Sequence, residues 1–455
     1  YNRTMSLHTH KTPGQLPETW NRRVVFFANL LSLFYGNEME THALREEVGT
    51  LETYGCRLVP IIDILFRERP NTLILERMPN RSLLEYFKNE LDLSLPALKI
   101  FSRGDYIALG SDRAETHREK ETLLHAINKT KAEWIDGYVT EPQLLKIAER
   151  ANKTTVSTFP GSYLGNNKLL LHQYLEKTGL PVFDTYIAEN TKAVKDGFEA
   201  LRKIGYRTAV VKAPIGASGI GMIKCHSPNA CQEIPDYLFH EGPCLVQGWI
   251  GPSLGDVDWV VSPSVQMFIK ENDLILHDIT EQILSKESIH EGNIAPPTFQ
   301  EYRDLVGDIL DQAEASGRWL HDQGYRGTAS VDFHLAKRAG RLEVRICEVN
   351  ARVTGCTYPS LLAQKLLPGG VWLMRNIRFS PPQIGSQLLK HLAQNKTLFK
   401  SGGVMGILPI NLNPDHQGKI VKGQFLFLGG SHRAVFGLLK QICEDGGYNG
   451  DYDRD

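Results

Sequence analysis

Two acidic side chains and one amide near residue 340 have the types and spacing of a magnesium site. Residues 331–336 (VDFHLA) are strand-like, and residues 342–350 (LEVRICEVN) are predicted as the return strand of a hairpin. Glu348 and Asn350 are two residues apart and therefore face the same side, while Asp332 lies on the partner strand. Mg²⁺ prefers such oxygen ligands. We therefore predict that Asp332, Glu348 and Asn350 bind Mg²⁺, or Mn²⁺ in its place.

Arg352 follows Asn350 by two residues and is predicted to point at the same site. The alternative is a hairpin whose polar face is simply solvated. The apolar neighbours Ile346, Val349 and Val353 oppose that alternative, because carboxylates among them are costly unless a cation compensates their charge.

A lysine followed by glycines at 210–222 (VVKAPIGASGIGM) is typical of a phosphate-binding hairpin. The lysine comes before the glycines, whereas a P-loop has it after them, and a second short strand follows. Backbone N–H groups of such a turn can approach phosphate oxygens without obstruction by side chains. A hairpin that needs glycines for its turn alone is the alternative. The predicted phosphate-binding residues are Lys212, Gly216, Ser218, Gly219 and Gly221.

The strand-like stretch 244–250 (CLVQGWI) ends in a polar loop, where exposed backbone groups can pair with an adenine ring. Gln247 can both donate a hydrogen bond to such a base and accept one from it. Either Asp256 or Asp258 is suitably placed to accept hydrogen bonds from ribose hydroxyls. Taken alone, the segment is equally typical of an ordinary edge strand.

The elements that position these residues follow from patterns along the chain. Residues 1–155 alternate buried-strand and helix patterns, which predicts an α/β domain. The strand-like segments there are 22–30, 71–78 and 105–110, a further apolar run lies at 56–65, and 82–91 has helical spacing. A stretch rich in Ser, Thr, Gly and Pro at 154–165 predicts a domain boundary. Residues 376–455 are predicted as a small α+β extension, for which two roles remain open: a cap over a substrate site or a homodimer interface.

Composition excludes several classes of protein. Of 455 residues, 42% are hydrophobic and 23% charged, as in soluble globular proteins. A formal net charge of -1 offers no basic field to nucleic acid or to a membrane surface. The longest apolar run, 24–35, is too short to span a bilayer. The seven cysteines lack CxxC spacing, which indicates reduced thiols. We therefore expect a cytoplasmic protein with no nucleic-acid or membrane partner.

Together the three motifs resemble the ATP-grasp family, in which ATP lies between two lobes. The resemblance covers about residues 156–375, with a flap lobe at about 206–250, and residues 1–155 resemble the pre-ATP-grasp domain of that family. The implied fold class is α/β with α+β lobes. The resemblance also implies that Lys168 is a second phosphate-region lysine. It implies a hinge strand that binds adenine through Gln247, Trp249 and Ile250, with Asp258 at the ribose.

Within that family the chain is most similar to the pheganomycin-type peptide ligases. The likeness is carried by 348–364 (EVNARVTGCTYPSLLAQ) and 290–297 (HEGNIAPP), and the latter segment either lines the substrate end or is a proline-stiffened loop. Two residues depart from relatives. Gln247 stands where many have Glu, and Ser330 stands where D-Ala-D-Ala ligases have arginine, which places the anionic transition-state role on Arg352.

The resemblance implies an ATP-dependent carboxylate–amine ligase that works through an acyl phosphate and releases ADP and phosphate. Lys212 and Arg352 are the predicted catalytic residues, ATP and Mg²⁺ the cofactors, and amino acids or peptides the substrates. One alternative is an ATP-grasp enzyme with another acceptor, either a thiol ligase or a kinase. The other is a nucleotide-binding regulator that has lost catalysis.

Overall fold

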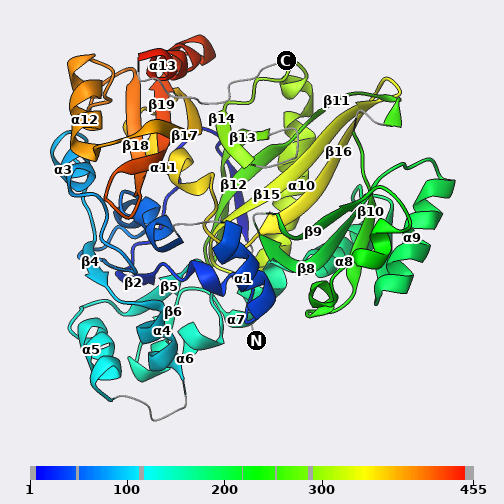
Figure 1. Ribbon diagram of the computed structural model, residues 1–455, viewed down its shortest axis with the longest axis horizontal. Helices are drawn as coiled ribbons and strands as arrows, with labels where there is room; N and C mark the ends of the chain where they lie inside the picture. Colours follow the sequence, from blue (N-terminus) through cyan, green and yellow to red (C-terminus); the bar gives the residue numbers. More distant parts are fainter. Residues whose placement is uncertain are drawn as a thin grey trace.

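The computed structural model describes residues 7–47, 51–111, 117–217, 219–251, 254–284 and 290–445. Within these ranges the strands form three sheets, and Figure 1 shows them with helices packed around them. The predicted phosphate-binding residue Ser218 lies outside the described residues.

The first sheet has five parallel strands in the order β4-β3-β2-β5-β6. Its central strand β2 (Val24–Phe27) is buried at every position, as its apolar run predicts. The chain moves outward from β2 to β3 and β4 and then returns to β5 on the other side of β2. The remaining elements are β3 (Thr72–Leu75), β4 (Ala97–Ile100), β5 (Trp134–Gly137), β6 (Thr154–Thr155), α2 (Ile62–Leu65), α3 (Arg81–Asn89), α4 (Arg103–Gly110), α5 (His117–Asn128) and α6 (Pro142–Arg150).

The strand predicted at 105–110 is wrong, because these residues belong to helix α4. A capping box starts the helix: Ser102 Oγ accepts from Asp105 N at 3.1 Å, and the Asp105 carboxylate accepts from Ser102 N at 2.7 Å. This local satisfaction of backbone donors outweighs the strand-like composition. The apolar run 56–65 likewise folds as the 3₁₀ helix η2 (Leu51–Leu58) and then α2.

The second sheet forms a separate flap lobe. Its antiparallel strands have the order β7-β10-β8-β9, and α9 (Thr191–Lys203) packs against it. The predicted glycine hairpin is confirmed as β8 (Ala209–Ala217) and β9 (Ile220–Cys225). The other elements around this lobe are β7 (Thr185–Ala188), β10 (Cys244–Gly248), α7 (Phe159–Gly165), α8 (Lys168–Thr178), η3 (Ala230–Glu233) and η4 (Asp236–Phe239).

Helix α1 belongs to the N-terminal part of the chain but lies against the flap lobe. The chain leaves β2 through the 3₁₀ helix η1 (Leu30–Ser32) and then forms α1 (Glu38–Glu47). Figure 1 shows α1 next to β8 and β9, and its residues contact β9. Two segments far apart in sequence therefore meet at the glycine hairpin.

The third sheet has the strand order β11-β15-β12-β13-β14-β17-β19-β18, with β1 added on β13 and β16 on β15. The predicted hairpin is confirmed as β15 (Gly327–Arg338) and β16 (Arg341–Asn350), and α10 (Tyr302–Asp322) packs against this sheet. The other elements are β1 (His8–Lys11), β11 (Val257–Val261), β12 (Pro263–Ile269), β13 (Asp273–Leu284), β14 (His290–Ala295), β17 (Val371–Gln383), β18 (Gly406–Pro414), β19 (Ile420–Gly429), α11 (Thr357–Leu366), α12 (Gly385–Gln394) and α13 (His432–Asp445).

The last strands of the chain continue the third sheet. β17 pairs with β14 on one side and with β19 on the other, so residues after 375 share its hydrogen bonds. They also share a core with the N-terminal part, in which Tyr86 Oη donates to the Phe399 carbonyl at 2.7 Å. The division into 1–155, 156–375 and 376–455 stays a prediction. Among the described residues, no helix is both long and apolar enough to cross a bilayer.

Candidate active site

The β15–β16 hairpin brings the three predicted metal ligands together. Asp332 is the register partner of Glu348, and Asn350 pairs with Ser330. Asn350 Nδ2 donates to Asp332 Oδ2 at 3.1 Å and lies 3.4 Å from Glu348 Oε1. Ser264 of β12 donates to the other Asp332 oxygen at 2.6 Å. A register shift directly after Asp332 forms a bulge, a feature that often re-aims side chains near sites.

Charge is unequally distributed within this set. Burial, followed by the charge of Glu348, raises the pKa of Asp332. Burial would also raise the pKa of Glu348, but the cations Lys168, Arg352 and Lys212 outweigh it and lower that pKa. Among the described residues, no group of three or more His, Cys, Asp or Glu side chains is arranged to hold a metal ion. Two carboxylates and an amide oxygen fit Mg²⁺, which takes few protein ligands and keeps water or phosphate oxygens.

Lys168 joins this hairpin to the flap. It is the first residue of α8, whose N-cap Asn167 accepts from the Leu170 N–H. Its Nζ lies 3.1 Å from Glu348 Oε2 and donates to the Gly216 carbonyl at 3.1 Å. A single ammonium group thus contacts both the acidic site and the glycine hairpin.

Lys212 is the second cation and lies on β8. Its ammonium makes no hydrogen bond or ion pair with the residues that the structure describes, and its Nζ lies 5.7 Å from the centre of the Phe183 ring. Burial lowers the pKa of Lys212, while Cys347 and Glu348 act in the opposite direction. A half-buried lysine whose ammonium makes no hydrogen bond within the described residues suits an anionic ligand.

The hairpin needs its glycines for shape. Gly219 and Gly221 have φ of +84° and +81°, in the left-handed region that other residues rarely adopt. A Cβ on Gly216 would lie 2.6 Å from the Ile220 carbonyl oxygen across the turn. The backbone is therefore bare on this turn, as close approach to a ligand requires.

Glu40 of α1 lies against this hairpin and was not predicted from the sequence. A Cβ on Gly221 would lie 2.7 Å from Glu40 Oε1. Glu40 is buried, and neither of its carboxylate oxygens accepts a hydrogen bond within the described part of the chain. Burial, then the charge of Glu241, raises the pKa of Glu40 to about 8. Nothing in the sequence around a helical glutamate signals such a contact.

The predicted nucleotide-binding strand is β10. Gln247 is buried and donates from Nε2 to Thr185 Oγ1 at 3.1 Å. Trp249 donates its backbone N–H to Thr208 at 3.0 Å, and the Ile250 side chain belongs to the core of the flap lobe. None of these contacts tests the predicted binding of adenine by Gln247, Trp249 and Ile250, which stays a prediction.

The two aspartates considered for ribose differ in their surroundings. Asp256 accepts from Arg338 Nε at 2.7 Å, so its carboxylate is already paired. Asp258, on β11, is exposed. This difference favours Asp258 for a ligand contact, which stays a prediction.

Arg352 is held by an amide that was also missed from the sequence. Arg352 Nη1 donates to Asn166 Oδ1 at 2.6 Å, and Asn166 Nδ2 donates to Tyr35 Oη at 3.1 Å. The same amide contacts the backbone of Ser162 and Ala351. The segment 290–297, for which a loop was one interpretation, is instead strand β14 up to Ala295.

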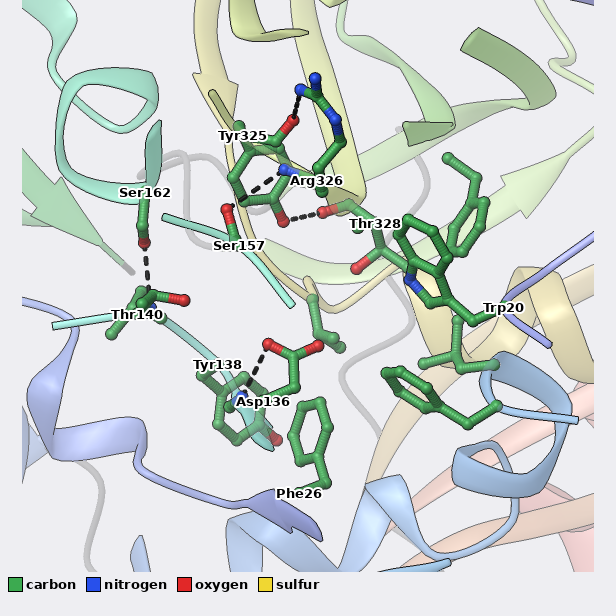
Figure 2. A pocket seen from close by; sticks show the side chains of 17 residues that line it. Trp20, Phe26, Asp136, Tyr138, Thr140, Ser157, Ser162, Tyr325, Arg326 and Thr328 are labelled. Carbon is green, nitrogen blue, oxygen red and sulfur yellow. Dashed lines mark hydrogen bonds between the residues drawn. The ribbon is translucent and has the colours of Figure 1, made fainter. Parts of the chain in front are cut away.

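A small cavity lies where the first sheet meets the third (Figure 2). Its volume is about 20 Å³, enough for roughly one water molecule. Asp136 borders it and accepts the Gly137 N–H at 2.9 Å, and burial raises the pKa of Asp136 to about 7. Ser162 accepts from Thr140 N at 3.1 Å across the same junction. The cavity is too small for a substrate.

Comparison with known proteins supports the fold. No family model matches the chain. A curated relative, the [butirosin acyl-carrier protein]–L-glutamate ligase of Niallia circulans, is 24% identical over 310 residues. The match covers 66% of this chain and 66% of the relative, so it spans just under two thirds of the relative's length.

Solved structures match over most of the chain. N5-carboxyaminoimidazole synthetase of Staphylococcus aureus has a TM-score of 0.53 and 11% identity, with 96% of this chain and 100% of that chain covered. Biotin carboxylase of Campylobacter jejuni has a TM-score of 0.55 and 12% identity, with 93% of this chain and 91% of that chain covered. L-amino acid ligase of Bacillus licheniformis has a TM-score of 0.50 and 13% identity, with 94% of this chain and 98% of that chain covered. The pheganomycin-type subgroup stays a prediction. The chain therefore has the fold of these ATP-grasp enzymes.

Proposed function

We propose that the chain is an ATP-dependent carboxylate–amine ligase. The observation that carries the proposal is the contact of Lys168 with both Glu348 and the Gly216 carbonyl, which joins the acidic hairpin to the glycine flap. The curated relative is a ligase, and several similar structures are complexes with ADP, ATP or MgADP. Both observations support a nucleotide between the flap and the hairpin.

In the proposed reaction, an oxygen of the donor carboxylate attacks the γ-phosphorus of ATP, and the bond to the ADP oxygen breaks. The acceptor amine nitrogen then attacks the acyl carbon. Phosphate leaves with the electron pair of the C–O bond, and the nitrogen loses a proton to water. The products are an amide, ADP and phosphate, and the enzyme chiefly positions and neutralises the reactants.

The residues of this chain have distinct roles in the proposal. Lys212 and Lys168 balance the phosphate charge, and the bare flap backbone approaches the phosphates and excludes water. Arg352, oriented by Asn166, donates hydrogen bonds to the developing oxyanion. Mg²⁺, held by Asp332, Glu348 and Asn350, would neutralise further phosphate charge when bound.

For the substrates we propose amino acids on both sides. The donor is the carboxylate of a small amino acid, including non-proteinogenic ones, and the acceptor is the amine of an amino acid or peptide. The named activity of the curated relative joins L-glutamate to an acyl-carrier protein, and one structural neighbour is an L-amino acid ligase. These names support an amino-acid substrate.

Product analysis tests the proposal. The chain is incubated with ATP, Mg²⁺ and a mixture of amino acids and short peptides, and the products are identified by mass spectrometry. We expect an amide together with ADP and phosphate, because the proposal places Lys168 and Lys212 at the terminal phosphates of ATP. With hydroxylamine in place of the amine, the donor alone is expected to give an acyl hydroxamate.

A matched variant separates chemistry from folding. Glu348→Ala removes one proposed metal ligand and the partner of Lys168, so we expect loss of turnover with an unchanged melting temperature. Glu281→Ala, which removes a half-buried carboxylate bonded to Thr298, is the control and is expected to retain turnover. AMP and pyrophosphate as the main products, or full activity of Glu348→Ala, contradict the proposal.

A further inference from the structure

A second, larger cavity lies at the carboxyl edge of the first sheet. Its volume is about 240 Å³, far above the roughly 10–15 Å³ that one water needs. Segments that follow β2, β3, β4 and β5 line it. In open parallel sheets, ligands bind outside the carboxyl ends of strands where the strand order reverses, here between β2 and β5. The cavity therefore has the size and position of a small-molecule site.

The walls of this cavity are amphiphilic. Much of the surface is apolar, from Phe27, Leu31, Ile74, Leu75, Phe101 and Ile107. Arg103, at the start of α4, supplies the cation of the wall. Its guanidinium makes no hydrogen bond or ion pair with the residues that the structure describes, although Glu38, Glu76 and Glu141 also line the cavity. An unpaired guanidinium beside apolar walls suits a carboxylate attached to an apolar group.

The cavity also borders the active site. Tyr35 lines it, and its hydroxyl accepts from Asn166, the amide that holds Arg352. Tyr35 has φ of +49°, an uncommon conformation for a bulky residue and one often found where a side chain must be positioned for function. Thr41 of α1 lines the cavity too, while Glu40 of the same helix touches the flap.

We propose that this cavity binds the amine acceptor, an amino acid or short peptide with an apolar side chain whose carboxylate pairs with Arg103 and whose amine faces Tyr35. The inference rests on the proposed ligase function. The donor carboxylate must lie at the phosphates beside Glu348 and Arg352, whereas an acceptor keeps its own carboxylate free. A carboxylate at Arg103 therefore belongs to the acceptor.

Direct binding tests the site without turnover. The probes are L-phenylalanine and L-leucyl-L-phenylalanine, each compared with its C-terminal amide, by calorimetry in the presence of ADP and Mg²⁺. We expect at least one acid to bind, and its amide to bind about tenfold more weakly or worse, since a charge-assisted bond is lost. Arg103→Gln is expected to weaken binding of the acid to the level of the amide. Arg81→Gln, an exposed arginine on α3, is the control and is expected to bind as the unmodified chain does.

Kinetics then distinguish the site from the reaction. Arg103→Gln should raise the KM for the acceptor about tenfold while leaving the rate of donor hydroxamate formation unchanged, and Arg103→Lys should restore part of the affinity. The site is overturned if neither acid binds. It is also overturned if Arg103→Gln, at an unchanged melting temperature, binds the acid as tightly as the unmodified chain does. Carboxylate-dependent binding without any ATP turnover overturns the ligase function and leaves the site standing.

Discussion

A single amide, Asn166, connects three parts of the chain around Arg352. Its oxygen accepts from Arg352 and from the Ala351 N–H, while its nitrogen donates to Tyr35 of the N-terminal part and to the Ser162 carbonyl. Only a side chain that both donates and accepts can make this set of bonds. An aspartate of the same size would lose the donor half. Asn166 is therefore a positioning residue for the arginine that the proposed reaction uses.

At the same scale, Glu40 predicts a dependence of stability on pH. Its pKa is about 8 in the folded chain against an ordinary 4.5, because burial disfavours its charge. The unfolded chain therefore releases this proton first as the pH rises from 4.5 to 8, and the folded state loses stability across that window. We expect Glu40→Gln to remove this loss and to be more stable than the unmodified chain at pH 8 by roughly 1–3 kcal/mol.

Melting temperatures at several pH values between 4.5 and 8.5 measure the effect. Glu46→Gln is the matched control, because Glu46 lies on the same helix but is exposed. The two variants should diverge as the pH rises. Parallel curves for both would show that the Glu40 carboxyl is not the group that titrates.

The predictability of these residues depends on how local their contacts are. Asp332, Glu348 and Asn350 could be placed together from the sequence, because one hairpin and the two-residue strand repeat fix their relation. Glu40, Tyr35 and Asn166 could not, because each contacts a segment more than a hundred residues away. Strand periodicity carries no information on such long-range packing.

Between elements, the contact of α1 with the flap hairpin is the feature that the sequence did not reveal. Asn37, which precedes α1, donates to Glu241 at 3.2 Å and also contacts the Tyr237 carbonyl, so the helix touches the flap lobe at two places. The hairpin itself was predictable from its glycines. The wrong strand prediction at 105–110 has a local cause and not a long-range one, since the Ser102 capping box decided the conformation of these residues.

Two glycines of the hairpin provide a matched test of this contact. Both have positive φ, so alanine at either position costs about 1–2 kcal/mol of backbone strain. A Cβ on Gly219 meets nothing within 4 Å, whereas one on Gly221 lies 2.7 Å from Glu40 Oε1 and 3.1 Å from the Ile215 carbonyl oxygen. We therefore expect Gly221→Ala to weaken binding of ADP and Mg²⁺ several-fold more than Gly219→Ala does, as measured by calorimetry. Equal effects would show that the contact of α1 with the hairpin has no influence on nucleotide binding.

For the whole molecule, the third sheet unites residues from His8 to Gly429. β17 runs across the predicted boundary at 375 and contains Pro381 and Pro382 near its end. A register shift between Arg378 and Gln383 lets the strand accommodate these prolines. The alternation of strands and helices did predict the α/β fold class. The same alternation could not predict that the last strands of the chain complete the third sheet.

A shortened chain tests this continuity. Ending the chain at Arg375 cuts β17 and removes β18, β19 and their share of the core that they form with the N-terminal part. We expect the product to lose cooperative thermal unfolding and to bind a hydrophobic dye, because the β17 edge that paired with β19 and apolar core residues become exposed. Retention of the melting curve of the full chain would instead establish residues 376–455 as a dispensable extension.

The shared core also has a consequence for biosynthesis. Its buried residues range from Trp20 to Ile442, so most of the chain must leave the ribosome before that core can close. Contacts of such high sequence separation form slowly, because a long loop must be ordered first. During synthesis the strands of the N-terminal part therefore keep apolar surface exposed until the C-terminal strands have been made. Chaperones bind such surfaces, and the chain aggregates when chaperones are scarce.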